Sequence, residues 1–169
     1  MKNEITLKAV VLGIILSMLL SGAMAYLGLF AGMTVSASIP AAVLSMGILS
    51  LFKKSNILEN NLVQTAASAG ESLAAGVIFT IPALILMGYW NSFDYLEVAK
   101  ISAIGGIIGV MFTVPLRRAF ILVANLQYPE GIATAEVLKA GDKARTASDI
   151  DSRNGLRMIL MSSLAGGIM

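Results

Sequence analysis

The sequence predicts an all-α protein that crosses a membrane several times. The chain of 169 residues is 57% hydrophobic and only 13% charged, whereas a soluble domain carries about 25% charged residues. Long uncharged stretches alternate with short polar ones, and the mean hydropathy is +0.83. We expect one transmembrane domain over residues 1–169, with about four spans, a short re-entrant or broken segment and a truncated last helix.

The first two spans are predicted from the 44 uncharged residues between Lys8 and Lys53. As a single helix they would reach roughly 66 Å, about twice the ~30 Å hydrocarbon core of a bilayer. The glycines of "YLGLFAGMTV" (26–35) favour a turn, which predicts helices over about 8–28 and 33–52. The alternative for the opening is a signal peptide, because "SGAMA" follows the apolar run as a cleavage site would.

A third span is predicted after the charged loop at 53–59. From Asn60 to Phe93 the only charged residue is Glu71. This stretch is too long for one helix perpendicular to the membrane, so Gly76 and Pro82 are predicted to break it.

The fourth span is predicted over about 101–116, where "GGIIG" offers small residues for close helix contact. Arg117 and Arg118 are expected to end it. The eleven uncharged residues 119–129 are too short to cross and predict a re-entrant or broken segment. A polar connector over 139–157 follows.

The last apolar stretch, 158–169, is also too short to span. It indicates a chain cut within a transmembrane helix and hence the N-terminal part of a longer protein. A short interfacial tail is the alternative.

Composition excludes several functions. The chain has no histidine and no cysteine, which removes disulfides, thiolate chemistry and histidine-based metal sites or proton relays. Any proton or cation must therefore be handled by acidic residues. A net charge of +2 without a basic-aromatic pattern or a Gly-rich phosphate loop gives no indication of nucleic acid. We expect no cofactor, no metal site and no enzymatic activity.

The basic residues predict an orientation. With the N-terminus inside the cell, only Lys100 of the twelve basic residues falls outside, as the positive-inside rule favours. We therefore expect a multi-pass protein of the cytoplasmic membrane.

Polar side chains mark one face of the predicted helix at 60–76. They recur at three- and four-residue spacings and comprise Asn61, Gln64, Thr65, Ser68, Glu71 and Ser72. A charge in mid-membrane costs at least ~2.5–3.5 kcal/mol and usually faces protein or a water-filled cavity. The pattern favours a helix lining a polar pathway, with Glu71 as a proton or cation site. Two alternatives stay open: the span begins after Glu71, or Glu71 accepts hydrogen bonds between packed helices.

A second polar interruption is "LQYPEGIATAEVL" (126–138). Glu130 lies between a proline and a glycine, at the start of a new helix. Short segments interrupted by Pro and Gly point to transporter binding sites, and the alternative is a turn in which Glu130 caps the helix. Glu136 is expected to form a surface ion pair with Lys139.

Ser36, Ser38 and Pro40 could loosen the second span locally. Serines in membrane helices more often bond to their own backbone, so these serines are not assigned as ligands.

Three long motifs resemble the oligopeptide transporter family, above all its prokaryotic branch, which is related to the yellow-stripe-like carriers of metal chelates. They are "GMTVSASIPAAVLSM" (32–46), "SNILENNLVQTAASAGESLAAGVIFTIPALIL" (55–86) and "LQYPEGIATAEVL" (126–138). The likeness covers nearly the whole chain but only the N-terminal part of such transporters.

The resemblance implies secondary active transport, usually proton-coupled, of short peptides or peptide-like chelates. It implies as partners the lipid bilayer, protons, the substrate, and the rest of the transporter or a homo-oligomer. Glu71 and Glu130 gain weight as sites because both lie inside matching motifs. The alternative is a small structural or accessory membrane subunit without transport of its own. A membrane-embedded enzyme is a third, weaker option, built on a Glu71–Glu130 carboxylate pair if the two residues meet in space.

Overall fold

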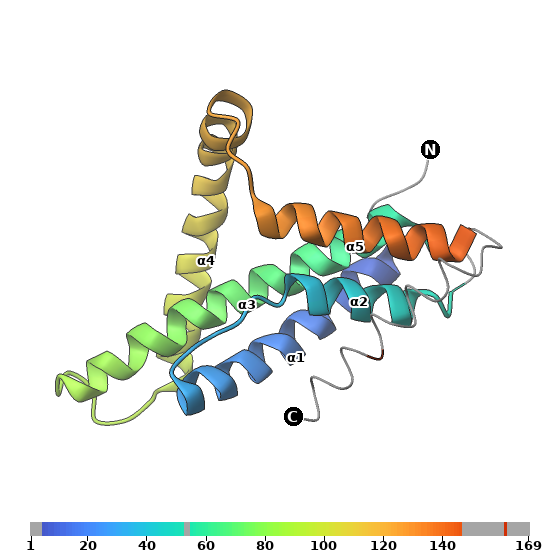
Figure 1. The fold of residues 1–169 in the computed structure, drawn as a ribbon. Helices are drawn as coiled ribbons and strands as arrows, with labels where there is room; N and C mark the ends of the chain where they lie inside the picture. Colours follow the sequence, from blue (N-terminus) through green and yellow to red (C-terminus); the bar gives the residue numbers. More distant parts are fainter. Residues whose placement is uncertain (1–4, 53–54, 147–160, 162–169) are drawn as a thin grey trace. The chain divides into compact units, whose positions relative to one another are not determined.

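All regular structure in the described part of the chain is helical. The computed structural model describes residues 5–52, 55–146 and 161 (Figure 1). The helices are α1 (Leu7–Ala31), α2 (Ser38–Leu49), α3 (Ile57–Leu86), α4 (Tyr95–Arg117), the π-helix η1 (Arg118–Val123) and α5 (Pro129–Thr146). Among these residues, the stretches long and apolar enough to cross a membrane are Leu7–Ala31, Ile57–Leu86 and Tyr95–Val123. The predicted all-α, multi-span fold is confirmed.

The chain divides into two compact units. Unit 1 comprises Met1–Leu20, Val35–Glu71 and Pro129–Met169, and unit 2 comprises Ser21–Thr34 and Ser72–Tyr128. Helices α1 and α3 therefore each contribute residues to both units. The polar cluster described below, formed by Ser36, Ser38, Ser68, Glu71 and Glu130, belongs to unit 1, whereas Ser72 belongs to unit 2.

Small residues let the helices of unit 1 approach closely. Its core joins Ala9, Ala41 and Ala67 to larger apolar residues of the same three helices, α1, α2 and α3. A Cβ placed on Gly13 of α1 would lie only 3.0 Å from the Cβ of Ala66 on α3. Without a side chain at position 13 the two backbones can pack, as is common between membrane helices.

Helix α5 packs along α2 within unit 1 (Figure 1). Leu138 joins Ala42 and Met46 in a second buried cluster. Gly141 is covered by the side chain of Met46, so this position of α5 also needs a small residue. The polar helix α5 is thereby held beside α2 by its few apolar and small residues.

Helix α2 is shorter than the predicted 33–52. Residues 33–37 are not helical, and the helix starts at Ser38. Pro40 supplies the reason, because its ring would clash with the carbonyl four residues earlier in a longer helix, whereas proline fits the first turn. Twelve helical residues reach about 18 Å, less than the ~30 Å core of a bilayer. Helix α2 alone is therefore too short to cross, and the irregular residues 33–37 precede it.

Helix α3 runs without interruption through both predicted break points, Gly76 and Pro82. One proline costs a single backbone hydrogen bond, which a long helix tolerates, and Thr80 donates its hydroxyl to the carbonyl of Gly76 at 2.8 Å within the same helix. The helix ends before Gly88, whose φ of +77° suits a glycine after a helix terminus. The prediction of a broken third span is therefore wrong.

The α-helical part of the fourth helix, α4, ends at Arg117 as predicted, but the chain does not leave the helix there. Residues 118–123 continue it as a π-helix, and the break comes at Asn125, whose φ is +48°. Most of the predicted re-entrant segment 119–129 therefore belongs to the fourth span, which reaches Val123. Only residues 124–128 of that segment are irregular.

The predicted connector over 139–157 is helical as far as Thr146, and the rest of it lies outside the described residues. The predicted last helix at 158–169 also lies outside them, except Met161.

Candidate functional site

Ser36, in the irregular stretch before α2, and Ser38, the first residue of α2, lie at the centre of a polar cluster. Ser38 donates its backbone N–H to Ser36 Oγ at 3.3 Å, and the two hydroxyl oxygens lie 3.2 Å apart. These hydroxyls bond outside their own helix turn, unlike most serines in membrane helices. The sequence did not assign these serines as ligands, and the structure places their hydroxyls in a polar cluster.

Helix α3 brings Ser68 and Glu71 to the same cluster. The hydroxyls of Ser38 and Ser68 lie 3.0 Å apart, within hydrogen-bond distance. Glu71, one turn further along α3, is 6% exposed and accepts a hydrogen bond from the backbone N–H of Ala37. The buried carboxylate thus lies beside the irregular backbone that precedes α2.

The first turn of α5 completes the cluster with Glu130. Its carboxylate accepts a hydrogen bond from the hydroxyl of Ser36. Hydrogen bonds with Ser36 and Ser38 lower the pKa of Glu130, because they favour the ionised carboxylate. Glu130 also lies close enough to Glu71 for the two charges to interact. The structure therefore brings together the two carboxylates that the sequence could only name separately.

The other members of the predicted polar stripe diverge from Glu71. Asn61, Thr65 and Ser72 are exposed, and Gln64 is half-buried. Thr65 donates its hydroxyl to the carbonyl of Asn61 at 2.8 Å, within its own helix. The side of α3 that is buried carries Asn60, Val63, Ala67 and Glu71. Of the six stripe residues, Ser68 and Glu71 alone join the cluster formed by the described residues.

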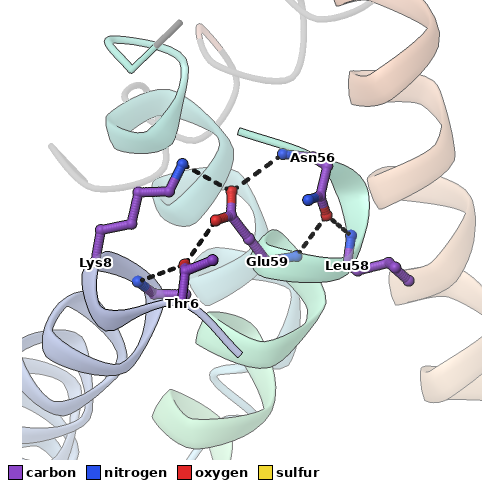
Figure 2. Close-up of polar contacts among 6 residues, drawn as sticks. Thr6, Lys8, Asn56, Leu58 and Glu59 are labelled. Atoms are coloured by element: carbon purple, nitrogen blue, oxygen red, sulfur yellow. Dashed lines mark hydrogen bonds and ion pairs between the residues drawn. The ribbon is translucent and has the colours of Figure 1, made fainter. Parts of the chain in front are cut away.

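A second polar cluster, which the sequence did not single out, ties the start of α1 to the start of α3 (Figure 2). Glu59 is 1% exposed, forms an ion pair with Lys8 at 2.9 Å and accepts the hydroxyl of Thr6 at 2.6 Å. Its carboxylate also accepts the backbone N–H of Asn56 at 3.2 Å. The charge of Glu59 predicts that it belongs to the loop 53–59, but it lies in the first turn of α3.

The signal for this second cluster was the spacing of Asn56 and Glu59. Asn56 Oδ1 accepts the N–H groups of Leu58 and Glu59 at 2.8 and 3.0 Å. With the return bond from the Glu59 carboxylate this is a capping box, in which a polar cap and an acid three residues later satisfy each other's end of the helix. The cluster is explained by helix capping and packing, without a ligand.

Two further ion pairs among the described residues are exposed. Glu136 and Lys139 form the predicted pair at 2.8 Å, and Glu97 pairs with Lys100 at 3.0 Å. The described residues bring no three His, Cys, Asp or Glu side chains together in a way that could hold a metal ion.

The long apolar helices define a multi-pass helical membrane protein, with carboxylates and hydroxyls gathered at an irregular stretch of backbone. Comparison with known proteins names its family. A sequence profile described as "OPT oligopeptide transporter protein" matches residues 4–169. The chain belongs to the OPT oligopeptide transporter family, as the three motifs indicated.

A bacterial relative agrees with this assignment. The "Putative oligopeptide transporter" of Haemophilus influenzae is 49% identical over 144 residues, which are 85% of this chain. These residues are 22% of that relative's length, so the chain spans about a fifth of it. No solved structure matches the chain.

Proposed function

We propose that this chain is part of a proton-coupled carrier that moves short peptides or peptide-like metal chelates across the cytoplasmic membrane. The proposal draws on the family and on the name of the H. influenzae relative. It makes the protein a secondary active transporter and not an enzyme. Its partners would be the bilayer, protons, the substrate, and further transporter segments or a second copy of the protein.

One observation carries the proposal: the buried carboxylate of Glu71 lies near the Glu130 carboxylate, in a cluster that also holds the hydroxyls of Ser36, Ser38 and Ser68 at an irregular stretch of backbone. Within a membrane, irregular backbone is tolerated only where it is buried in protein or lines a water-filled cavity. Intramembrane acids usually mark substrate or proton pathways. The cluster is thus the best candidate for a coupling site among the described residues.

Glu71 suits proton coupling because a carboxylate loses its charge when it binds a proton, and because the residues around it on α3 are small. The neighbours at three and four residues along α3 are Ala67, Ser68, Ala74 and Ala75, which leave room for water or a substrate group. A proton from the outer solution would bind the carboxylate and neutralise it. The neutral site could then cross between outward- and inward-open states, and the proton would leave to the cytoplasm.

The exposed polar residues of α3 would extend the pathway away from this site. Asn61, Gln64, Thr65 and Ser72 remain candidates for contact with substrate, while Ser68, Glu71 and Glu130 form the coupling cluster. The amide and hydroxyl groups of the four substrate-contact candidates can donate hydrogen bonds to a peptide backbone and accept them from it.

The test is transport by the complete protein, purified and reconstituted in vesicles. Wild-type protein should accumulate a labelled di- or tripeptide when the outside is more acidic. Glu71→Gln mimics the protonated acid and should abolish accumulation while retaining exchange of labelled for unlabelled peptide. Full proton-driven accumulation by the Glu71→Gln protein would exclude Glu71 as the coupling site, and no accumulation by the wild type would overturn the proposed function.

A further inference from the structure

The polar cluster contains a connection between Glu130 and Glu71 that runs through the backbone. Glu130 accepts the hydroxyl of Ser36, and Ser36 Oγ accepts the backbone N–H of Ser38 at 3.3 Å. Between these two serines lies Ala37, which is fully buried and whose N–H is donated to Glu71. The one residue whose amide reaches Glu71 is thus flanked on both sides by residues bound into the cluster.

The irregular stretch 33–37 is held by few other contacts on its N-terminal side. Met33, Val35 and Ser36 are exposed, and residues 33–37 lack the regular hydrogen bonds of a helix. On the other side, Ala37 O accepts the N–H of Ala41 at 2.8 Å in the first turn of α2. The direction of the Ala37 amide therefore depends on where Ser36 is held.

Glu130 is suited to hold Ser36 because it remains charged. Among the described residues it forms hydrogen bonds with hydroxyls and no ion pair, and these bonds lower its pKa. A hydrogen bond to an ionised acceptor is roughly twice as strong as one between neutral groups. The lower pKa keeps the carboxylate in that stronger state over the ordinary pH range.

The charged surroundings do not offer another anchor. Helix α2 has no charged residue, and the other charges of α5 begin at Glu136, beyond the first turn that holds Glu130. On α3 the next charge before Glu71 is Glu59, which is engaged with Lys8. Apart from the Ala37 amide at Glu71, the charge-assisted contact that the described residues give to 33–37 is the Glu130–Ser36 bond.

We propose that Glu130 and Ser36 are positioning residues, which fix the irregular stretch 33–37 so that the Ala37 amide points toward Glu71. Glu130 then acts on the coupling carboxylate through the backbone and does not itself carry the transported proton. The transport part of this inference rests on the proposed function. The structural part, that the two side chains order residues 35–38, does not depend on it.

The first test measures backbone order directly, by amide hydrogen exchange in the complete protein in detergent. Ser36→Ala and Glu130→Gln should each raise exchange at residues 35–38 about tenfold, the effect of losing one charge-assisted hydrogen bond. In the double variant the two effects should not multiply, because both changes remove the Ser36–Glu130 bond. Ser36→Thr keeps a hydroxyl and should restore slow exchange.

Glu136→Gln is the matched control, because it removes an acid of the same helix that pairs with Lys139 at the surface. It should leave exchange at 35–38 unchanged, and α4 should exchange normally in every variant if the protein is folded. Unchanged exchange at 35–38 in either single variant, or effects that multiply in the double variant, would overturn the positioning.

The second test separates this inference from the proposed function. In vesicles, proton-driven peptide uptake should fall about tenfold in Ser36→Ala and in Glu130→Gln, no further in the double variant, and recover in Ser36→Thr. Uptake by the wild type together with multiplying losses would refute the positioning and leave the carrier intact. Absence of wild-type uptake, with the exchange pattern as expected, would refute the carrier and leave the positioning intact.

Discussion

The ion pair between Lys8 and Glu59 should be a main source of order at the start of α1. The two charged groups lie 2.9 Å apart, the Glu59 side chain is 1% exposed and the Lys8 side chain is 28% exposed. Removing one partner of a buried pair costs 3–5 kcal/mol when the other charge stays buried. Because Lys8 is partly exposed, water can solvate its charge once Glu59 is removed. We therefore expect Glu59→Ala to destabilise the start of α1 by about 3 kcal/mol, at the low end of that range.

The assay is amide hydrogen exchange over residues 5–12 and 56–62 of the complete protein. A loss of about 3 kcal/mol corresponds to opening that is more than a hundredfold more frequent. Glu97→Ala is the control, because Glu97 has the same position relative to its cap Asp94 as Glu59 has to Asn56, but its side chain is 52% exposed. Exchange near position 97 should change about twofold or less, as for an exposed pair.

A double-mutant cycle would refute the reasoning. If the pair contributes as a pair, Lys8→Met combined with Glu59→Gln should destabilise the start of α1 less than the sum of the two changes, by more than about 1 kcal/mol. Additive effects would mean that Glu59 acts through Thr6 and Asn56 alone, and that the ion pair contributes nothing to the order of α1.

Three further predictions follow from the same structure. Asn56→Ala should raise exchange in the first turn of α3 by an amount equal to about 1 kcal/mol, because two N–H groups lose their acceptor. Gly13→Leu should lower the stability of the purified protein by about 1–3 kcal/mol in thermal unfolding, because the position faces α3, whereas Gly22→Leu, with open space around it, should be tolerated. Hydrogen bonds lower the pKa of Glu130 from its ordinary 4.5, so its contribution to the order of this stretch should be complete above pH 4.5 and decline as the pH falls below that value. Exchange at Ser38, whose N–H is accepted by Ser36 Oγ, should follow this course in the wild type and lose it in Glu130→Gln.

The helical, multi-span character of the chain was predictable because it depends on composition and on the spacing of charges. The bounds of individual helices were less so, since local signals compete with packing. Pro82 does not break α3, because a long apolar helix loses only one backbone bond there. Pro40, in contrast, limits α2 at its first turn. The same residue type therefore had opposite consequences that depend on where the helix begins.

The candidate site was predictable in its acids and not in its hydroxyls. Glu71 and Glu130 were conspicuous as rare charges in apolar motifs, but their proximity depends on α5 packing along α2, which no local pattern encodes. Periodicity placed Asn61 and Glu71 on one face, yet α3 buries the side that carries Val63 and Ala67, so the stripe is divided between buried and exposed positions. Ser36 and Ser38 were passed over because membrane serines usually bond their own backbone.

The central claim is that Glu71 couples peptide movement to proton movement, and the most direct measurement is proton flux itself. Vesicles containing the complete protein and an internal pH-sensitive dye are given external peptide without an imposed pH difference. The account predicts that peptide entry acidifies the interior of wild-type vesicles, and that Glu71→Gln vesicles exchange peptide with no acidification. Equal acidification by the wild type and by Glu71→Gln, or peptide entry without acidification in the wild type, would contradict it.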